Sequence, residues 1–405
     1  MTSITHVGLD VHTTNYTVCC YSIQDDQTFA IVQMEPDYKH ILKYLNRVNS
    51  QHGGKLKFLC GYEAGCLGYS LYHELTCHGV DCVILAPSTM ANTKGNQVKT
   101  DRRDAKNIAK RGYRVKPTSY KISRLATVKR SILSVLLTYH DNHIAKCLAY
   151  HLYSPVYVPT EQDNAVKEYI RMRDDGVEAL KRMKQQIIAL CIRSGKRYDG
   201  KSYWTKKHED WLLKLELGNE ILNETMREYL ARFYQLSEKV EIYNLRIEEF
   251  SRIPEYEEKV RHLCCMNGIA THTAMCAIVE IGDFKRFSSA EKFSAFLGLV
   301  PGERSSGDKE RRTRITKHGN AHLRRLLVEA TQSYSRGAVG KKSGRLKKRQ
   351  TGQPAEVVAY ADKAAERLRR KFRKVASHAN YNIAKTAVAR ELACFIWGMM
   401  TENYA

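Results

Sequence analysis

The sequence lacks the spacing patterns of several common metal sites. No Cys-x-x-Cys pair occurs among its 12 cysteines, and its 15 histidines do not follow ligand spacing, so we expect no Cys- or His-bound metal. Cys19, Cys20, Cys60 and Cys276 lie in apolar stretches, as free cysteines of a reducing compartment often do. We therefore expect these cysteines to be small buried side chains.

Long apolar runs and acidic residues are also scarce. No run approaches the roughly 18 apolar residues of a membrane-spanning helix, and the opening MTSITHVGLD lacks the features of a secretory signal. We therefore expect a cytoplasmic protein with no membrane partner. Only 43 Asp and Glu residues face 66 Lys and Arg residues, which gives a formal net charge of +23. This excess indicates a polyanionic partner, and nucleic acid is the first candidate. We therefore expect the protein to be associated with the nucleoid.

The first part of the chain has the pattern of a mixed α/β domain. Residues 5–33 form β-branched and alternating runs broken by short polar turns, which predicts a three-stranded meander. A buried strand ending at Glu63, a helix, the short strand DCVILAP and another helix follow. With 405 residues the chain can hold two or three domains, and residues 1–160 are predicted to form an RNase H-like α/β domain.

The rest of the chain is predicted to be mainly helical. Residues 161–252 contain two long amphipathic patterns around a turn-rich stretch, typical of an antiparallel coiled-coil hairpin or of an ordinary helical bundle. Residues 253–405 form the third predicted domain. Within it, HLCCMNGIATHT resembles a helix-hairpin-helix, whose turn can bind phosphate, although an ordinary helix turn has the same pattern. A basic tail with 13 Lys or Arg residues occupies 341–374, before an apolar closing helix.

Four carboxylates are candidate metal ligands. Asp101 and Asp104 lie three apart in KTDRRDAKNIAK and would share one helix face, although a helix start with Thr100 as N-cap is the better explanation when these acids are taken alone. Asp10 lies inside a predicted strand, where aspartate is disfavoured, and Glu63 ends another strand. Asp10 could instead open a turn, and Glu63 could simply face solvent. Gathered at one end of a sheet, the four would repel one another without a divalent cation. Oxygen ligands alone favour Mg²⁺ or Mn²⁺.

At this point a family resemblance becomes visible. The order of Asp10, Glu63, Asp101 and Asp104, together with the sequence TDRRDA at 100–105, resembles the DEDD transposases of bacterial insertion sequences. Their N-terminal domain is similar to the RuvC resolvase, and RNA-guided bridge recombinases belong to them. The resemblance extends over most of the chain, through SPVYVPT, WTKKHEDWL, FLGLVPGERSSGDKERRTRITKHGNAHLRRLL, KKRQTGQPAEVVA and VARELACFIWGM.

The resemblance implies a DNA recombinase that moves its own element. The four acids would be catalytic and would bind Mg²⁺ or Mn²⁺, and a serine in a Ser-Gly step would be the nucleophile. Here that serine is Ser306, with Ser305 as the alternative. A structured RNA would guide the enzyme by pairing with donor and target DNA. We also expect a homo-oligomer, a dimer that assembles into a tetramer on DNA.

Basic side chains near these residues are the candidate nucleic-acid contacts. Residues 304–325 contain eight Lys or Arg residues around the Ser-Gly step, where glycine lets the backbone approach a phosphate. The candidates are Arg102, Arg103, Arg304, Arg311, Arg312, Arg314, Lys317, Arg324, Arg325, Lys347, Lys348 and Arg349.

One segment departs from the family pattern. Residues 111–146 look inserted between the aspartate segment and the family's next motif, and they carry basic residues around an amphipathic stretch. They could contact RNA or DNA, or could disturb the presentation of Asp104.

Two other functions fit parts of the sequence. A RuvC-like nuclease would hydrolyse branched DNA with metal-activated water and would need the acids but no serine. A non-catalytic nucleic-acid-binding protein would use only the basic segments, and its binding would weaken steeply with salt.

Overall fold

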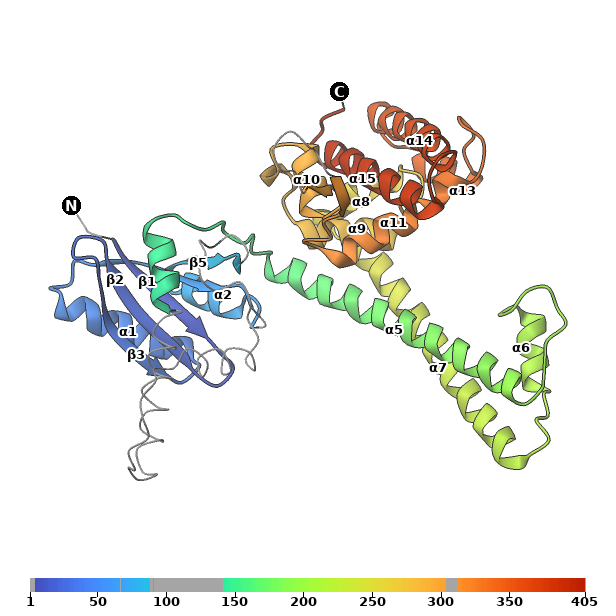
Figure 1. Cartoon of the computed structure of the whole chain (residues 1–405), viewed down its shortest axis with the longest axis horizontal. Coiled ribbons are helices and arrows are strands. Elements are labelled where there is room, and N and C mark those ends of the chain that lie inside the picture. Colours follow the sequence, from blue (N-terminus) through green and yellow to red (C-terminus); the bar gives the residue numbers. More distant parts are fainter. Residues whose placement is uncertain (1–3, 66, 88–89, 91–140, 304–311, 405) are drawn as a thin grey trace, which may run out of the picture. The chain divides into compact units, whose positions relative to one another are not determined.

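A computed structural model describes residues 4–65, 67–87, 90, 141–303 and 312–404 (Figure 1). The chain divides into two compact units, Met1–Val158 and Pro159–Ala405. In the described ranges no helix is long and apolar enough to span a membrane. Several predicted site residues lie outside the described residues: Arg102, Arg103, Asp101, Asp104, Arg304, Ser305, Ser306, Arg311 and most of the segment 111–146.

The first unit is built on a five-stranded mixed sheet. Its strands are β1 (Ile4–Val11), β2 (Tyr16–Ser22), β3 (Gln27–Met34), β4 (Lys57–Glu63) and β5 (Asp81–Leu85). Their order is β3-β2-β1-β4-β5, with β1, β2 and β3 antiparallel to one another in turn and β1, β4 and β5 parallel. The predicted meander and the two later strands are therefore confirmed, and the mixed α/β sheet agrees with an RNase H-like domain.

Helices cover both faces of this sheet. Helices α1 (Tyr38–Gln51) and α2 (Ser70–Cys77) pack against Val7 and Leu9 of β1, and helical residues 141–149 lie over the other face. Gly8 allows the close approach of this last helix, because a Cβ atom there would lie 2.0 Å from the carbonyl oxygen of Asp141. Helix α1 was not predicted from the sequence, although Asp37 caps it and its buried residues recur at helical spacing.

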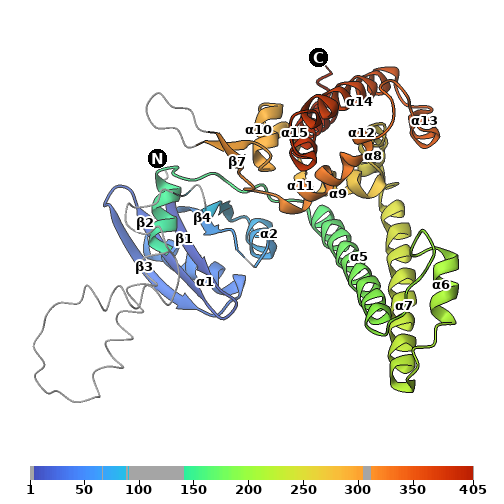
Figure 2. The same ribbon diagram turned by 45° about the vertical axis from the view of Figure 1, so that its right-hand side comes forward.

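The second unit begins with a long helical hairpin. Helices α5 (Glu161–Arg193) and α7 (Glu220–Phe250) run side by side, and the short α6 (Lys206–Leu213) lies at the free end (Figures 1 and 2). Thr160 caps α5, with Glu161 and Asp163 in its first turn. The two long helices and the shorter one between them lie where the apolar repeats predict them.

Among the described residues, eight further α-helices, a 3-10 helix (Phe284–Arg286) and a two-stranded sheet complete this unit. They are α8 (Pro254–Cys264), α9 (Thr271–Ile281), α10 (Ala290–Phe296), β6 (Pro301–Glu303), β7 (Arg312–Ile315), α11 (Ala321–Ala330), α12 (Gln332–Ser335), α13 (Gly344–Gln350), α14 (Ala355–Ala376) and α15 (Tyr381–Met400). Their core also includes Val166 and Ile170 of α5, so the base of the hairpin and the bundle share one hydrophobic core.

Helices α8 and α9 flank the predicted MNGI turn. Gly268 has φ +85, and a Cβ atom there would lie 2.4 Å from Ser333 Oγ and 2.5 Å from the Ala330 carbonyl oxygen. The side chain of Asn267 also donates to the carbonyl of Ser333. This turn is therefore packed against residues 330–333, and a phosphate contact at its backbone stays a prediction.

Candidate active site

Asp10 and Glu63 lie at neighbouring strand ends in the first unit. Strands β1 and β4 are parallel, with Leu9 opposite Tyr62, so Asp10 and Glu63 each follow the last residue of this paired register. Gly8 and Gly61 are also register partners, and helical residues 141–149 cover both. Because side chains two apart share a face, both carboxylates belong to the face that this helix covers.

The two carboxylates differ in their surroundings. Asp10 is only 7% exposed, and its carboxylate lies 3.3 Å from Nε2 of His12. It pairs with Thr17 of β2, so it lies within the strand rather than opening the turn that follows. Glu63 is the last residue of β4 and is half-buried. A buried and a half-buried carboxylate on one face fit a hard divalent cation. Asp101 and Asp104 lie outside the described residues.

In the second unit, paired strands β6 and β7 flank residues 304–311, which include Ser305 and Ser306 and lie outside the described residues. Pro301 pairs with Ile315, and Glu303 pairs with Arg312. Next to these paired strands, two segments of the chain pass in close contact at Gly298 (φ +66) and Gly319 (φ +77), and we call this contact the glycine crossing. Both glycines have backbone angles in the left-handed region of the Ramachandran plot. A Cβ atom would lie 2.2 Å from the His318 carbonyl oxygen at Gly298 and 1.9 Å from that of Phe296 at Gly319. Both positions therefore require glycine.

Arg324 holds the two chain segments of this crossing together. Its guanidinium donates to the carbonyl of Leu297 at 2.8 Å and to that of His318 at 3.2 Å. Leu297 precedes β6 and His318 follows β7. This half-buried arginine was predicted as a nucleic-acid contact, and its described contacts give it a structural role at the base of the serine loop.

A buried polar network joins α5, α9 and α11 beside this crossing. Asp174 of α5 accepts from His322 at 2.7 Å, from Arg173 at 2.8 Å and from Arg325 at 3.0 Å, and it lies 2.8 Å from His272. Its carboxylate is 10% exposed. Burial alone would raise the pKa of Asp174, but hydrogen bonds from His272 and His322 outweigh burial and lower it.

Glu280 of α9 is the second anion of this network. Arg171 donates to both of its oxygens, and Asn320, the N-cap of α11, donates to Oε2 at 2.8 Å. Burial opposes ionisation, but His322 and Arg171 lower the pKa of Glu280 to about 2. Hydrogen bonds to Asp174, Cys276 and Glu280 raise the pKa of His322 to about 11, so its two ring nitrogens donate to two carboxylates.

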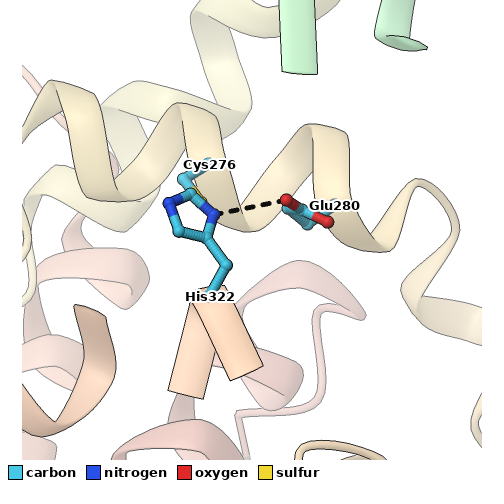
Figure 3. Close-up of side chains that lie close together, drawn as sticks. All are labelled: Cys276, Glu280 and His322. Atoms are coloured by element: carbon cyan, nitrogen blue, oxygen red, sulfur yellow. Dashed lines mark hydrogen bonds and ion pairs between the residues drawn. The ribbon is translucent and has the colours of Figure 1, made fainter. Parts of the chain in front are cut away.

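Cys276, Glu280 and His322 also bring possible metal-ligand atoms within 4.8 Å of one another (Figure 3). Both oxygens of Glu280 already accept hydrogen bonds from Arg171, and burial raises the pKa of the Cys276 thiol. A metal would have to displace these donors and protons. The group therefore fits a hydrogen-bond network better than a metal site.

This network was not predicted from the sequence, although one signal was present. Asp174 falls four residues after Ile170 and three before Val177, at a core-facing position of the apolar repeat in α5. An acid at such a position needs a buried partner. Apart from the neighbouring Arg173, its partners are His272, His322 and Arg325, and the last two lie 148 and 151 residues away along the chain, so spacing alone could not identify them.

Comparison with known proteins assigns the chain to a family. The "Transposase IS116/IS110/IS902 family" model matches residues 260–349, and a DEDD transposase model of IS110 matches residues 7–148. The chain is 29% identical over 372 residues to "Transposase for insertion sequence element IS1533" of Leptospira borgpetersenii, covering 91% of this chain and 95% of that one. It is 32% identical over 346 residues to "Putative transposase y4qE" of Sinorhizobium fredii, covering 84% and 75%.

The chain belongs to this family of insertion-sequence transposases. Membership indicates an enzyme that acts on DNA, and the DEDD type indicates use of a divalent metal. The first matched region contains Asp10, Glu63 and both aspartates outside the described residues. The second contains the Ser305-Ser306 loop, its glycine crossing, and the Cys276, Glu280 and His322 group.

Among the described residues of the transposase, the basic side chains predicted to contact nucleic acid fall into two groups. Arg314, Lys317, Lys347 and Lys348 are exposed. Arg325 is engaged with Asp174 and Glu329, and Arg349 donates to the carbonyl of Ile269. The exposed group therefore remains suited to phosphate, whereas Arg325 and Arg349, like Arg324, are held by the fold. Arg312 lies in β7, where it pairs with Glu303 in the strand register.

Replacing Asp174 with Asn should destabilise the second unit of the transposase. His322, Arg173 and Arg325 would lose their shared buried anion, and breaking a buried ion pair costs roughly 3 kcal/mol or more. For a unit of this size the melting temperature should fall by roughly 5 to 10 °C, measured by calorimetry. Glu178→Gln, which removes only an exposed pair with Lys181, should change it little. Equal melting of both variants would contradict the network's role.

The network also predicts how stability depends on pH. The pKa of Glu280 is about 2 in the folded chain against 4.5 as a free group, so its contribution is present above pH 4.5 and is lost as pH falls toward 2. The pKa of His322 is about 11 against 6.5, so its contribution is present below pH 6.5 and is lost as pH rises toward 11. Chemical denaturation across pH should show both declines, and Asp174→Asn should flatten the alkaline one.

Proposed function

We propose that this transposase is a DNA recombinase that moves an insertion sequence through a serine nucleophile. The observation that carries the proposal is the placement of Asp10 and Glu63 on one face of an RNase H-like sheet. The same chain carries the Ser306-Gly307 step in the region 260–349 that matches the transposase family. Strand cleavage and exchange would then need both units. The assignment of Ser306, with Ser305 as the alternative, is supported by the family resemblance and by the closed β6–β7 stem.

The acids would hold the metal. Asp10, Glu63, Asp101 and Asp104 would bind Mg²⁺ or Mn²⁺, which neutralises charge on a phosphodiester and favours deprotonation of the attacking hydroxyl. Ser306 Oγ forms a bond to phosphorus while the bond to the leaving sugar oxygen breaks, and that oxygen takes up a proton. The number of phosphate ester bonds is unchanged, so the covalent intermediate conserves the energy needed for rejoining.

The proposed partners are donor DNA, target DNA and a structured RNA that guides the enzyme. The net charge of +23 supports binding to these polyanions. The exposed Lys347 borders an open hollow of about 720 Å³, which Gly340, Lys341, Lys342, Gln350 and Thr351 also line. A dimer that assembles into a tetramer on DNA would allow serine and acids to act within one subunit or between subunits.

Incubation of labelled element-end DNA with the protein, RNA transcribed from the DNA beside its gene, and Mg²⁺ tests the proposal. A band that migrates slowly after denaturation and disappears on protease treatment would support a covalent serine adduct. Metal-dependent free ends without any adduct would favour the RuvC-like hydrolase. If the protein bound DNA without cutting it, under conditions in which a known recombinase cuts its own substrate, the non-catalytic alternative would be favoured.

The exposed lysines give a separate prediction on nucleic-acid binding. Replacing Lys347 and Lys348 by Gln should weaken RNA and duplex DNA binding across sequences and flatten the salt dependence by about 0.9 per lost phosphate contact on duplex DNA. Arg349→Gln should instead lower the melting temperature, because it loses the bond to Ile269. Lys39→Gln with Lys43→Gln on the exposed side of α1 is the charge-matched control. An unchanged salt slope would argue against phosphate contact at 347 and 348.

A further inference from the structure

The free end of the α5–α7 hairpin carries positive charge that the proposed chemistry does not use. Residues 182–207 contain eight lysines and arginines and a single acid, Asp199. Seven of these eight cations are exposed, and Lys184 is half-buried under the rings of Trp204 and Phe233. Such a block repels itself unless an anion lies nearby.

Among the described residues these cations have no carboxylate partner, unlike those at the base of the hairpin. Arg171, Arg173 and Arg246 each pair with a carboxylate. Within the described part of the chain, none of the eight cations in 182–207 forms an ion pair. The cations of 182–207 are therefore available to an external polyanion, although the acids Glu209, Asp210, Glu216 and Glu220 follow at the same end.

An ordered aromatic cluster lies within the same segment. Tyr203 is 45% exposed, and its ring packs edge-on against His208 at 4.9 Å and Tyr198 at 5.9 Å between centroids. His208 is fully buried, and its Nδ1 accepts from the backbone N–H of Trp204. The rings of His208 and Tyr198 therefore hold the ring of Tyr203 in position, while part of Tyr203 faces solvent. A fixed, exposed aromatic ring can stack with a nucleobase at little cost in side-chain entropy.

A polar groove lies between α5 and α7 near this end. It has a volume of about 770 Å³, and its lining includes Arg182, Gln186, Arg232, Gln235 and Lys239, with Glu238 as its acid. Arg182, Arg232 and Lys239 form no ion pair with any residue in the described ranges. Guanidinium, ammonium and amide groups are the usual donors to phosphate oxygens.

We propose that the free end of the hairpin binds a single-stranded segment of nucleic acid, with phosphates on the cations of 182–207 and a base stacked on Tyr203. A duplex would fit less well, because its bases are already stacked. The inference takes from the proposed function only that nucleic acid is the polyanion, and it needs neither the serine nor the metal. An acidic protein partner is the competing occupant, because Ile192, Leu213 and Ile221 are also exposed at this end.

Binding and photo-crosslinking of the full chain test the proposal. Unstructured RNA and DNA of about ten nucleotides, each with one 5-iodouracil, and a duplex of equal length serve as probes. Both single strands should crosslink to the peptide with Tyr203 more efficiently than the duplex, which can bind elsewhere on the chain. The single strand that crosslinks more strongly to this peptide shows whether the ligand is RNA or DNA. Tyr203→Ala should weaken binding about 5- to 100-fold, whereas Tyr203→Phe should not, because phenylalanine also stacks.

A triple variant tests the charge. Lys196→Gln, Arg197→Gln and Lys201→Gln together should flatten the salt slope by about 2 on single strands. Tyr381→Ala, at a 49% exposed ring, and Lys39→Gln, Lys43→Gln and Arg47→Gln on α1 are the matched controls. Crosslinks elsewhere only, equally strong crosslinking of the duplex to the Tyr203 peptide, or variants that behave like these controls would overturn the proposal. A change in oligomeric state without a change in binding would favour a protein partner. Adduct formation at Ser306 is read separately, so its failure leaves this result unaffected.

Discussion

Replacing Asp10 with Asn is expected to slow magnesium-dependent DNA cleavage by two to three orders of magnitude, roughly 3 to 4 kcal/mol in the barrier. The amide keeps the shape of the buried side chain and can still accept from His12, so the sheet should remain folded. What it loses is the negative charge that would hold the metal beside Glu63. Glu63→Gln should act in the same direction, since it ends the neighbouring strand of the same face.

Cleavage rates at saturating magnesium, with melting curves for each variant, measure this effect. Asp81→Asn is the matched control, because Asp81 begins β5 at the opposite end of the parallel strands and is exposed. It should cleave at the rate of the unmodified protein. If Asp10→Asn cleaved as fast as Asp81→Asn, the assignment of Asp10 to the metal site would be wrong.

The second large effect is expected at the serine loop. Ser306→Ala should abolish the covalent protein–DNA adduct, because alanine has no hydroxyl to form the phosphate ester. Gly307 follows Ser306 directly and gives the backbone freedom to approach a phosphate, whereas Ser305 lies between Arg304 and Ser306. Binding of RNA and DNA should be unchanged, since the substitution removes no charge.

Ser305→Ala is the closest available control and should still form the adduct. Denaturing gels of labelled donor DNA, followed by peptide mapping of the modified residue, distinguish the two serines. An adduct that persists in Ser306→Ala and disappears in Ser305→Ala would reverse the assignment. Normal cleavage by both variants, with no adduct in either, would favour hydrolysis by activated water.

Periodicity was enough to predict most of the fold. The meander, β4, β5, the two long helices and the closing helix all have strong repeats of apolar residues, and each lies where its pattern predicts. Helix α1 was missed because polar residues and Tyr38 dilute its apolar stripe of Ile41, Leu45 and Val48. The placement of Asp10 and Glu63 side by side also followed from the pattern, since parallel strands end at the same edge of a sheet.

Contacts between distant segments could not be predicted in this way. Composition marks Arg324, Arg325 and Arg349 as basic, but only the packed chain shows that their guanidinium groups are held by backbone carbonyls or by Asp174. The same holds for His322, whose two carboxylate partners come from α5 and α9. A one-dimensional pattern records charge and spacing, whereas these roles depend on which helices pack together.

The glycine crossing beneath the β6–β7 stem has a consequence for how such enzymes can change. Gly298, Gly319 and Arg324 already hold the segments before β6 and after β7 together, so the packing of the core does not depend on how many residues join these two strands. Doubling the length of a loop whose ends are held costs only about 0.6 kcal/mol of chain entropy. Insertions and deletions between β6 and β7 can therefore accumulate during evolution while the helices below keep their packing.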